Sequence, residues 1–458
     1  MNPPAAPLPD RIGKYRVLGK LGEGATSEVF LCRDDFNARD VAVKRVRAHA
    51  VDADDEALQA RFFAAEAALV GRLQHPNVVP IYDAVVDDEG SYVVMEYVAG
   101  TTLRPYCRPD ALLPLDQVVE IGFKCAMALG YVSRQGLIHR DVKPANLLAR
   151  LASAPQAASP TATGGGAAPP QIIDVKVSDF GSALNLRADT TQIFRVGSLI
   201  YMAPEQLDGA SLDARADIYS LGAVLYHLIA GRPPFEAQAQ SVLMAQIVTA
   251  EPAPLAGLRH GVEPAFDAVI QRALAKKSAD RYSGWPEFAQ ALSALVANRQ
   301  VPRGDSQSVL DSERFTLLRT LEFFSEFGDV ELWEVVHRAA WRRYPVDHLI
   351  YRRGEEGNTF HIIAAGAVDV HRDGKRVAFL GAGTSVGEMA YLAPNPELRR
   401  HSTDVAVVEP ATMISFTPES MARLSPNCRH LFDEAFIRVL VRRLHGAHEA
   451  LAHPRRIA

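Results

Sequence analysis

Short apolar runs separated by turn residues fill the first hundred positions of the chain. Runs of roughly four to eight residues between turn signals are typical of β-strands. One alanine-rich stretch among them, Glu56 to Leu73, has helical character instead. The pattern therefore predicts a small sheet with one helix, and the expected strands are Tyr15 to Leu18, Val29 to Cys32, Val41 to Val46, Val78 to Ile81 and Tyr92 to Tyr97.

Helical periodicity replaces these short runs between Leu115 and Ala297, which predicts a second lobe made mainly of helices. The longest apolar run, Ile218 to Gly231, is shorter than the roughly 20 residues that cross a bilayer, so we expect a buried helix and no membrane insertion. The segments with the clearest helical pattern are Val118 to Val132, Ile218 to Ala230 and Phe288 to Val296.

Three segments lack such a pattern. Residues 152–170 contain only Ala, Ser, Thr, Pro, Gly and Gln, so they bury too little apolar surface to become ordered and form a flexible insertion. Asn298 to Ser312 is rich in polar and small residues, which is typical of a linker. Residues 1–11 contain four prolines and no signal-like stretch, and are expected to be disordered.

A different pattern follows the linker. Phe315 to Arg338 is helical, strand-like pieces then recur between glycines, and Cys428 to Leu444 is helical again, which predicts a small β-barrel flanked by helices. The expected fold class is α+β, a β-rich and an α-rich lobe followed by this barrel. The expected boundaries are 1–11 for the N-terminus, 12–296 for the bilobal domain with its insertion at 152–170, 297–312 for the linker, 313–445 for the second domain and 446–458 for the tail.

Composition favours a soluble protein of several domains that does not bind nucleic acid. The 458 residues exceed the roughly 250 to 300 that one hydrophobic core serves. The formal charge, 49 − 54 = −5, is too modest for a nucleic-acid surface. The four cysteines are widely spaced and form no metal-binding pattern, which favours reduced thiols and a cytoplasmic location.

Phosphate chemistry is indicated by residues of the predicted sheet. Gly22 and Gly24 lie between two strands, where glycines let backbone N–H groups approach phosphate oxygens. Lys44 closes the sequence Val41-Ala42-Val43-Lys44 and could reach the phosphates, and Glu66 could hold its ammonium group. Each feature taken alone has an ordinary explanation, a glycine turn or two surface charges.

A more specific signal is the segment His139 to Asn146. It places Asp141 and Asn146 in one loop, so that one can orient and deprotonate an acceptor hydroxyl while the other binds Mg²⁺. Lys143 adds positive charge where a phosphoryl group would move. Asp179, within Ser178-Asp179-Phe180-Gly181, supplies a second oxygen ligand, which suits an ion that takes few protein carboxylates.

The order of these motifs resembles that of the eukaryotic-like protein kinases over about residues 12 to 296. Gly197 to Glu205 is similar to the family's peptide-positioning loop and A-P-E segment, and Asp217 to Gly222 to the helix that anchors the catalytic loop. Arg281 falls where the family pairs an arginine with the A-P-E glutamate, Glu205. The Lys143-Pro144 version of the loop resembles the serine/threonine branch, and the sequence around Gly22 and His75-Pro76-Asn77 resembles the bacterial members.

This resemblance implies a serine/threonine protein kinase that uses ATP with Mg²⁺, or with Mn²⁺, to phosphorylate protein substrates. The implied catalytic residues are Asp141, Lys143, Lys44 and Glu66, and the implied metal ligands are Asn146 and Asp179. Met95 would be the gatekeeper, and Glu96 to Val98 the hinge. The implied nucleotide site comprises Leu21, Gly22, Glu23, Gly24, Val29, Ala42, Lys44, Met95, Glu96, Val98, Asn146 and Asp179.

Regulation is implied at Arg140, which in the resembled family receives a phosphorylated activation loop, because a phosphate pairs well with guanidinium. Thr190 and Thr191 are the expected sites of autophosphorylation, and Ser198 in the peptide-positioning loop is a further regulatory candidate. Two threonines in a solvated loop are the alternative.

The second domain contains four further motifs, Phe323 to Phe327, Arg353 to Gly357, Ile363 to Val370 and Gly383 to Ala390. Through them, residues 313–445 resemble the cyclic-nucleotide-binding domains. Gly387 and Glu388 match the family's G-E pair, which meets the cyclic phosphate through backbone N–H groups and accepts from the ribose 2′-hydroxyl. The family's phosphate-binding arginine falls at His401, or at Arg400 if the alignment shifts. We expect cAMP or cGMP as the ligand. A dimerisation or docking domain, and with it a homodimer, is the alternative.

Two alternative functions fit the sequence less well. A pseudokinase would be expected to have lost Lys44, Asp141 or Asp179, and all three are present. A module like a transcription factor would need a DNA-binding helix pair after the second domain, and only a short tail follows Leu444.

Overall fold

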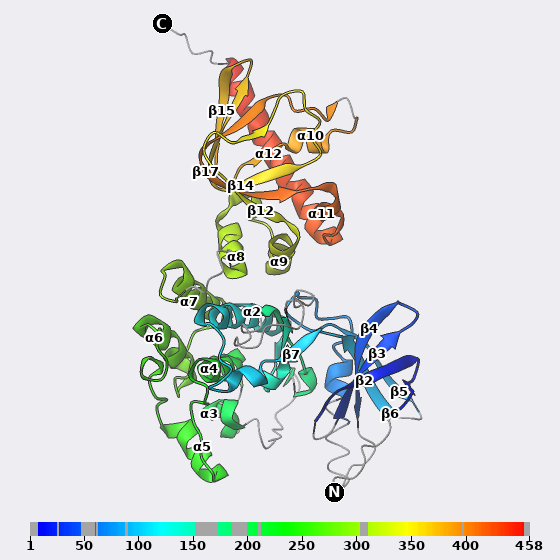
Figure 1. The fold of residues 1–458 in the computed structure, drawn as a ribbon, viewed down its shortest axis with the longest axis vertical. Coiled ribbons are helices and arrows are strands. Elements are labelled where there is room, and N and C mark those ends of the chain that lie inside the picture. The colour runs from blue at the N-terminus through cyan, green and yellow to red at the C-terminus, as the bar shows by residue number, and fades with distance from the viewer. Residues whose placement is uncertain are drawn as a thin grey trace, which may run out of the picture. The chain divides into compact units, whose positions relative to one another are not determined.

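The computed structural model describes residues 8–24, 27–46, 60, 63–87, 90–151, 172–182, 184–185, 199–208, 212–302, 310–395 and 398–452. The chain divides into two units, Met1–Ser308 and Val309–Ala458, whose elements are labelled in Figure 1. The predicted insertion at 152–170 lies outside the described residues. The finer domain boundaries given above stay predictions.

A six-stranded antiparallel sheet forms the N-terminal lobe of the first unit, in the order β1-β2-β3-β4-β6-β5. Alternate residues of β3 point into a core that includes Phe30 and Cys32, where Val41, Val43 and Val94 meet them. The strands are β1 Arg11–Ile12, β2 Tyr15–Glu23, β3 Ser27–Asp34, β4 Arg39–Val46, β5 Ile81–Asp87 and β6 Gly90–Glu96.

Two predictions for this lobe were wrong in their bounds. Residues 63–67 are helical, but turns occupy 68–72, so the helix does not extend to Leu73. Gly71 has a φ of +68°, the left-handed conformation that commonly follows a helix end. Val78 forms only an isolated bridge with Val177, and β5 begins at Ile81. Pro80 explains this, because proline has no N–H to offer a strand neighbour.

Helices dominate the second lobe, as predicted. Helix α2 (Leu115–Arg134) contacts α4 (Ala214–Ala230) and α7 (Trp285–Ala297). A Cβ at Gly222 of α4 would lie 2.8 Å from the Cβ of Ala273, so glycine permits the approach of α6. The remaining helices are α3 Pro204–Leu207, α5 Gln240–Thr249 and α6 Pro264–Ala273, and the short strands are β7 Gly100–Thr102, β8 Leu137–Ile138, β9 Leu147–Leu151, β10 Ile172–Val177 and β11 Leu184–Asn185.

The second unit combines a sheet in the order β12-β17-β14-β15 with helices, and β13 and β16 pair with β17 and β14. The helical stretch predicted from Phe315 to Arg338 is interrupted, because Phe323 and Phe324 turn inward between two helices to join a buried aromatic cluster. The elements are α8 Asp311–Thr320, α9 Asp329–Arg338, β12 Ala340–Tyr344, β13 Leu349–Tyr351, β14 Phe360–Arg372, β15 Lys375–Gly381, β16 Ser385–Val386, α10 Glu388–Leu392, β17 Asp404–Phe416, α11 Pro418–Ala422 and α12 Pro426–Ala452.

The first half of α12 is anchored in the sheet of this unit. Phe432 packs on the rings of Phe360 (β14) and Phe416 (β17), with centroids 6.1 and 4.9 Å apart. Phe436 packs on Phe360 at 4.9 Å. Beyond them the apolar side chains of the helix become exposed, as at Ile437. The helix is therefore fixed by its N-terminal turns, while its later turns depend on polar contacts.

The predicted α+β class is confirmed: a β-rich lobe, a helical lobe and a sheet domain with flanking helices. Within the described ranges, none of the helices has the length and apolar character needed to span a bilayer. All four cysteines are free and buried. Burial raises the pKa of Cys32 to about 11 and that of Cys107 to about 12.

His361 in β14 makes the stability of the second unit sensitive to acid. Its Nδ1 lies 2.7 Å from the Ser415 hydroxyl, and burial lowers its pKa to about 4. The unfolded chain takes up this proton near pH 6.5, so it binds more protons than the folded state between pH 6.5 and 4. Stability should therefore fall as the pH drops through this window, by at most about 3 kcal/mol.

Urea unfolding of the wild type and of His361→Asn at pH 7 and pH 4.5 checks this expectation. Asparagine can still bond with Ser415 but does not titrate, so the variant should lose clearly less stability on acidification. An equal acid loss in both proteins would contradict the assignment.

Candidate active site

Three charged side chains meet at the junction of the sheet and the helical lobe. The Nζ of Lys44 donates to Glu66 Oε1 at 2.6 Å and to Asp179 Oδ1 at 2.7 Å. Strands β3 and β6 flank β4 and hold Lys44 opposite Val29 and Val93. Glu66 comes from the helical residues 63–67, and Asp179 follows β10. The fold thus brings together a cation and two carboxylates that are far apart in the sequence.

Burial and mutual charge set the ionisation of this group. Burial alone would lower the pKa of Lys44, but the carboxylates of Asp179 and Glu66 outweigh it and raise the pKa. Burial raises the pKa of Glu66, whereas at Asp179 the effect of burial is outweighed by the Lys44 ammonium, which lowers the pKa. Lys44 therefore stays charged, and Asp179 remains a carboxylate that can bind a cation.

The segment His139 to Asn146 is fixed by the buried Asp217 of α4. The two carboxylate oxygens of Asp217 accept from the backbone N–H groups of His139 at 2.7 Å and Arg140 at 2.8 Å. Arg140 has a φ of +67°, which costs a non-glycine residue energy of order 1 kcal/mol. The two bonds to Asp217 offset that strain and hold the loop in its bent shape.

Asp141 is the polar centre of this loop. Its Oδ2 accepts from Lys143 Nζ at 2.7 Å and from Asn146 Nδ2 at 3.1 Å. Asn146 Nδ2 also donates to the Asp141 carbonyl at 2.9 Å. Because the amide nitrogen of Asn146 serves Asp141, its oxygen is the atom that it can offer to a cation.

Asn146 and Asp179 fit the metal ion that the sequence predicts. The backbone N–H and the hydroxyl of Ser178 both donate to the Asn146 carbonyl, at 2.9 and 3.0 Å, which ties the two segments together. One carboxylate and one amide oxygen are hard ligands that suit Mg²⁺ and leave positions for phosphate oxygens. In the part of the chain that the structure describes, no group of three His, Cys, Asp or Glu side chains could hold a metal alone.

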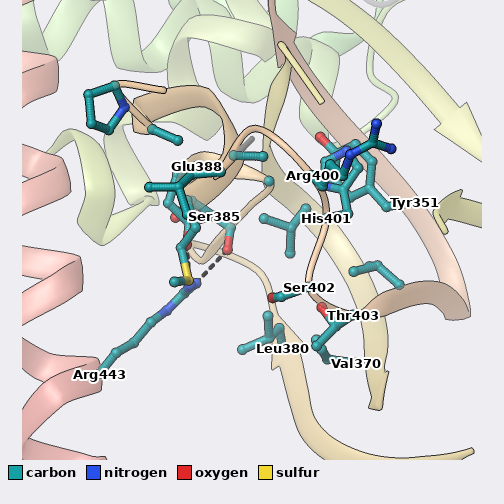
Figure 2. Close-up of a pocket in the computed structure, with 18 residues that line it drawn as sticks. Tyr351, Val370, Leu380, Ser385, Glu388, Arg400, His401, Ser402, Thr403 and Arg443 are labelled. Atoms are coloured by element: carbon teal, nitrogen blue, oxygen red, sulfur yellow. Dashed lines mark hydrogen bonds and ion pairs between the residues drawn. The ribbon is translucent and has the colours of Figure 1, made fainter. Parts of the chain in front are cut away.

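The second unit contains a separate pocket of about 500 Å³, shown in Figure 2. Gly387 lines it with a φ of +85°, and a Cβ there would lie 2.4 Å from the Tyr351 hydroxyl oxygen, so the position requires glycine. Glu388 begins α10 and is buried in the wall of the pocket. Its carboxylate accepts from the guanidinium of Arg443 on α12.

The two candidates for a phosphate-binding arginine position lie in the same pocket. The ring of His401 stacks on that of Tyr351 with centroids 3.9 Å apart, and burial lowers the pKa of the imidazole, so His401 is neutral at pH 7. Arg400 is exposed, and its Nη1 donates to the Gly354 carbonyl at 2.7 Å. At the position where the family has its phosphate-binding arginine, this chain therefore has His401, an uncharged residue in the pocket wall.

Comparison with known families decides the class of the chain. The model of the protein kinase domain matches residues 15–294, which is more than half of the chain. The chain belongs to the protein kinase family. A second model, that of the cyclic nucleotide-binding domain, matches residues 341–427. Both resemblances drawn from the sequence are thereby confirmed.

Curated relatives of this kinase come from bacteria. The serine/threonine-protein kinase PknB of Mycobacterium leprae is 36% identical over 313 residues, 67% of this chain and 46% of the relative. PknB of Mycolicibacterium smegmatis is 38% identical over 315 residues with the same coverage. A probable serine/threonine-protein kinase of Corynebacterium efficiens is 36% identical over 297 residues, 62% of this chain and 42% of the relative. The chain spans less than half the length of these relatives.

The other predicted nucleotide-site residues of this kinase lie on strands around Lys44. Gly22 pairs with Val29 between β2 and β3, and Ala42 pairs with Met95 between β4 and β6. Their contact with ATP stays a prediction. Leu21 and Glu23 lie at the end of β2, Gly24 directly after it, Glu96 at the end of β6 and Val98 two residues further.

The fully buried Arg281 pairs with the partly buried Glu205 in the helical lobe of the kinase, as the resemblance implies. The two guanidinium nitrogens of Arg281 donate to the two carboxylate oxygens of Glu205 at 2.6 and 2.8 Å. The side chain of Arg281 is fully buried, and it also donates to the carbonyls of Ala275, Arg215 and Lys276. This one side chain therefore joins α3, the start of α4 and the segment after α6.

The structure describes only some of the predicted regulatory residues. Thr190, Thr191 and Ser198 lie outside the described residues, so phosphorylation there stays a prediction. Arg140 is described, and its carbonyl accepts from Gln206 Nε2 at 3.2 Å, which links the catalytic loop to α3.

Glu96 has contacts that the sequence did not predict. Its two carboxylate oxygens accept from Arg150 of β9 at 2.9 Å and from Lys176 of β10 at 2.8 Å. These strands pair with each other and flank the insertion. The predicted hinge is thus held by the hairpin of the helical lobe. The partners lie 54 and 80 residues away in the sequence, and no local pattern indicates them.

Proposed function

We propose that the protein is a serine/threonine kinase that transfers the γ-phosphoryl group of Mg-ATP to hydroxyl groups of protein substrates. The observation that carries the proposal is the contact of Lys44 with both Glu66 and Asp179. It holds a charged ammonium beside a metal-binding carboxylate, on the lobe that also presents the glycine-rich turn. Phosphoryl transfer depends on such positioning and charge stabilisation.

Each side chain of the site has its own role in the proposed phosphoryl transfer. Lys44 pairs with phosphate oxygens of the nucleotide, and Asn146 and Asp179 hold Mg²⁺, or Mn²⁺ in its place. Bound metal would neutralise the charge that develops on the phosphates. Asp141 accepts the proton of the acceptor hydroxyl and orients that group. Lys143, 2.7 Å from Asp141, adds positive charge where the phosphoryl group moves.

Activation is proposed to depend on Arg140. Phosphorylation of Thr190 or Thr191 would supply a dianion that pairs with its guanidinium and orders the segment around them, with Ser198 as a further regulatory residue. We also propose a cytoplasmic location, which the four buried, unpaired cysteines support, because reduced thiols are typical of that compartment.

The second unit is proposed to bind a cyclic nucleotide, cAMP or cGMP, as an effector of the kinase. The glycine at 387 and the buried carboxylate of Glu388 support this role. The family match of residues 341–427 favours it over a docking or homodimerisation domain. An effector of this kind requires two states of the protein that the nucleotide distinguishes.

Purified full-length chain, radiolabelled ATP and a generic acceptor protein test this proposal. We expect transfer of label to serine or threonine with Mg²⁺, self-labelling at Thr190 or Thr191 by mass spectrometry, and a change of rate with cAMP or cGMP. Asp179→Asn should reduce transfer to background, because the metal loses its carboxylate. A folded wild type that labels neither itself nor any acceptor would overturn the proposed activity.

A further inference from the structure

Arg443 lines the pocket of the second unit, although it is distant in sequence from the other residues of the pocket. It belongs to the later turns of α12, and its side chain reaches Glu388 and the Ser385 carbonyl, the latter at 2.6 Å. Figure 2 shows it extending from its helix toward Ser385, while Arg400 lies on the opposite side beside Tyr351. The Glu388 side chain is 2% exposed, so its charge depends on Arg443 for compensation.

Two polar atoms in the pocket wall still have no partner. Ser385 Oγ and Glu388 Oε2 are buried and make no hydrogen bond, although both residues line the pocket. A buried polar atom without a partner costs roughly 1 to 3 kcal/mol, so such atoms mark positions where a ligand can bond. A carboxylate oxygen only accepts, so a ligand must present a hydroxyl or another donor to Glu388.

The basic side chains that line the pocket in the described ranges differ in charge and in direction. His401 is neutral and stacked on Tyr351. Arg400 is exposed, and it donates to the Gly354 carbonyl at the rim. Arg443 is the cation whose guanidinium is directed at the buried end of the pocket, where Ser385 and Glu388 lie.

We propose that Arg443 is the phosphate-binding arginine of this pocket and that a ribose phosphate ligand recruits it by exchanging partners. The ribose 2′-hydroxyl of the ligand replaces Arg443 as the donor to Glu388, and the released guanidinium then pairs with the ligand phosphate. After this exchange the buried Glu388 carboxylate keeps a hydrogen-bond donor and the partly exposed Arg443 guanidinium gains an anion, whereas a neutral nucleoside would displace Arg443 without offering it an anion. The inference rests on the proposed cyclic-nucleotide effector role of this unit.

The exchange also links the ligand to α12. The early turns of this helix are fixed by Phe432 and Phe436, and Arg443 is a polar tether of its later turns. A ligand that redirects Arg443 therefore acts on the position of those turns, which is the differential contact that an effector needs.

Calorimetric titration of the full-length chain with cAMP, cGMP, adenosine and guanosine tests the proposal. The wild type should prefer each cyclic nucleotide over its nucleoside by at least about tenfold. In Arg443→Gln this preference should nearly vanish, because cyclic-nucleotide affinity drops by about 10- to 100-fold while nucleoside affinity is kept or improved. Arg443→Lys should retain part of the preference, since it keeps the charge without the planar fork.

Arg442→Gln is the matched control. Arg442 is the neighbouring arginine, exposed and paired with Glu322 at 2.6 Å, so its loss should leave all four affinities unchanged. A wild type that binds neither cyclic nucleotide overturns the effector role and this inference together. A wild-type preference that persists in Arg443→Gln overturns the inference alone and leaves the effector role standing.

Discussion

Replacing Asp141 with asparagine is expected to lower kcat for phosphoryl transfer by about 100- to 10,000-fold. Asparagine keeps the shape of the side chain but cannot take the proton of the acceptor hydroxyl. Its amide would also place an N–H or a neutral oxygen opposite Lys143, which now donates to a carboxylate at 2.7 Å. The KM for ATP should change by less than about threefold, because Asp141 is not among the residues assigned to the nucleotide.

Initial rates at varied ATP and acceptor concentrations measure this effect. Asp110→Asn provides a control, because Asp110 is exposed and its pairing with Arg108 lies outside the site, so both constants should match the wild type. If Asp141→Asn retained more than a tenth of the wild-type kcat, Asp141 would not be the group that accepts the proton.

Removing the buried Arg281, which pairs with the partly buried Glu205, is expected to destabilise the kinase unit by about 3 kcal/mol. In Arg281→Met the partly buried carboxylate of Glu205 loses both short bonds. Three backbone carbonyls lose a donor as well. Such a loss is a large fraction of the stability of a typical domain.

Urea unfolding followed by tryptophan fluorescence measures the change, in a Trp333→Phe and Trp341→Phe background that leaves Trp285 of the same lobe as the probe. The double variant Arg281→Met with Glu205→Leu should regain much of the stability, because neither charge is then left unpaired. Arg108→Met removes an exposed pair and should have little effect. A single variant as stable as the wild type would mean that the pair contributes nothing to the fold.

The contacts within the predicted catalytic loop could be anticipated because its residues are close in sequence. Asp141, Lys143 and Asn146 lie within six positions, and the structure has them in direct contact. Lys44 and Glu66 could be paired because one ends a clear strand motif and the other lies on a helical stretch. In these cases, short-range patterns constrain which side chains can meet.

The contacts of Glu96 and Arg443 could not be predicted in this way. Arg443 lies 55 residues from Glu388, on a helix whose exposed arginines look alike in the sequence. Which of them turns into the pocket depends on how α12 is fixed by its aromatic residues at the opposite end. Such a contact is a property of tertiary packing, so periodicity and spacing carry no signal for it.

Some predicted boundaries of helices and strands were wrong for a related reason. Phe315 to Arg338 has helical periodicity throughout, yet burial of Phe323 and Phe324 in the aromatic cluster breaks it into two helices. In contrast, α4 ends as expected at Ala230, because Gly231 takes the left-handed conformation of a helix end. Local signals decide boundaries only where packing does not override them.

Because every sulfhydryl group is covered by other side chains, this protein is suited to site-directed labelling with dyes. Maleimides and related reagents attack accessible thiolates, and burial keeps all four native cysteines protonated and covered. A cysteine introduced at an exposed position of each unit, such as Phe36 and Val377, would carry a fluorophore pair without prior removal of native cysteines. Energy transfer between the fluorophores would then test in real time whether added nucleotide changes the distance between the two labelled positions.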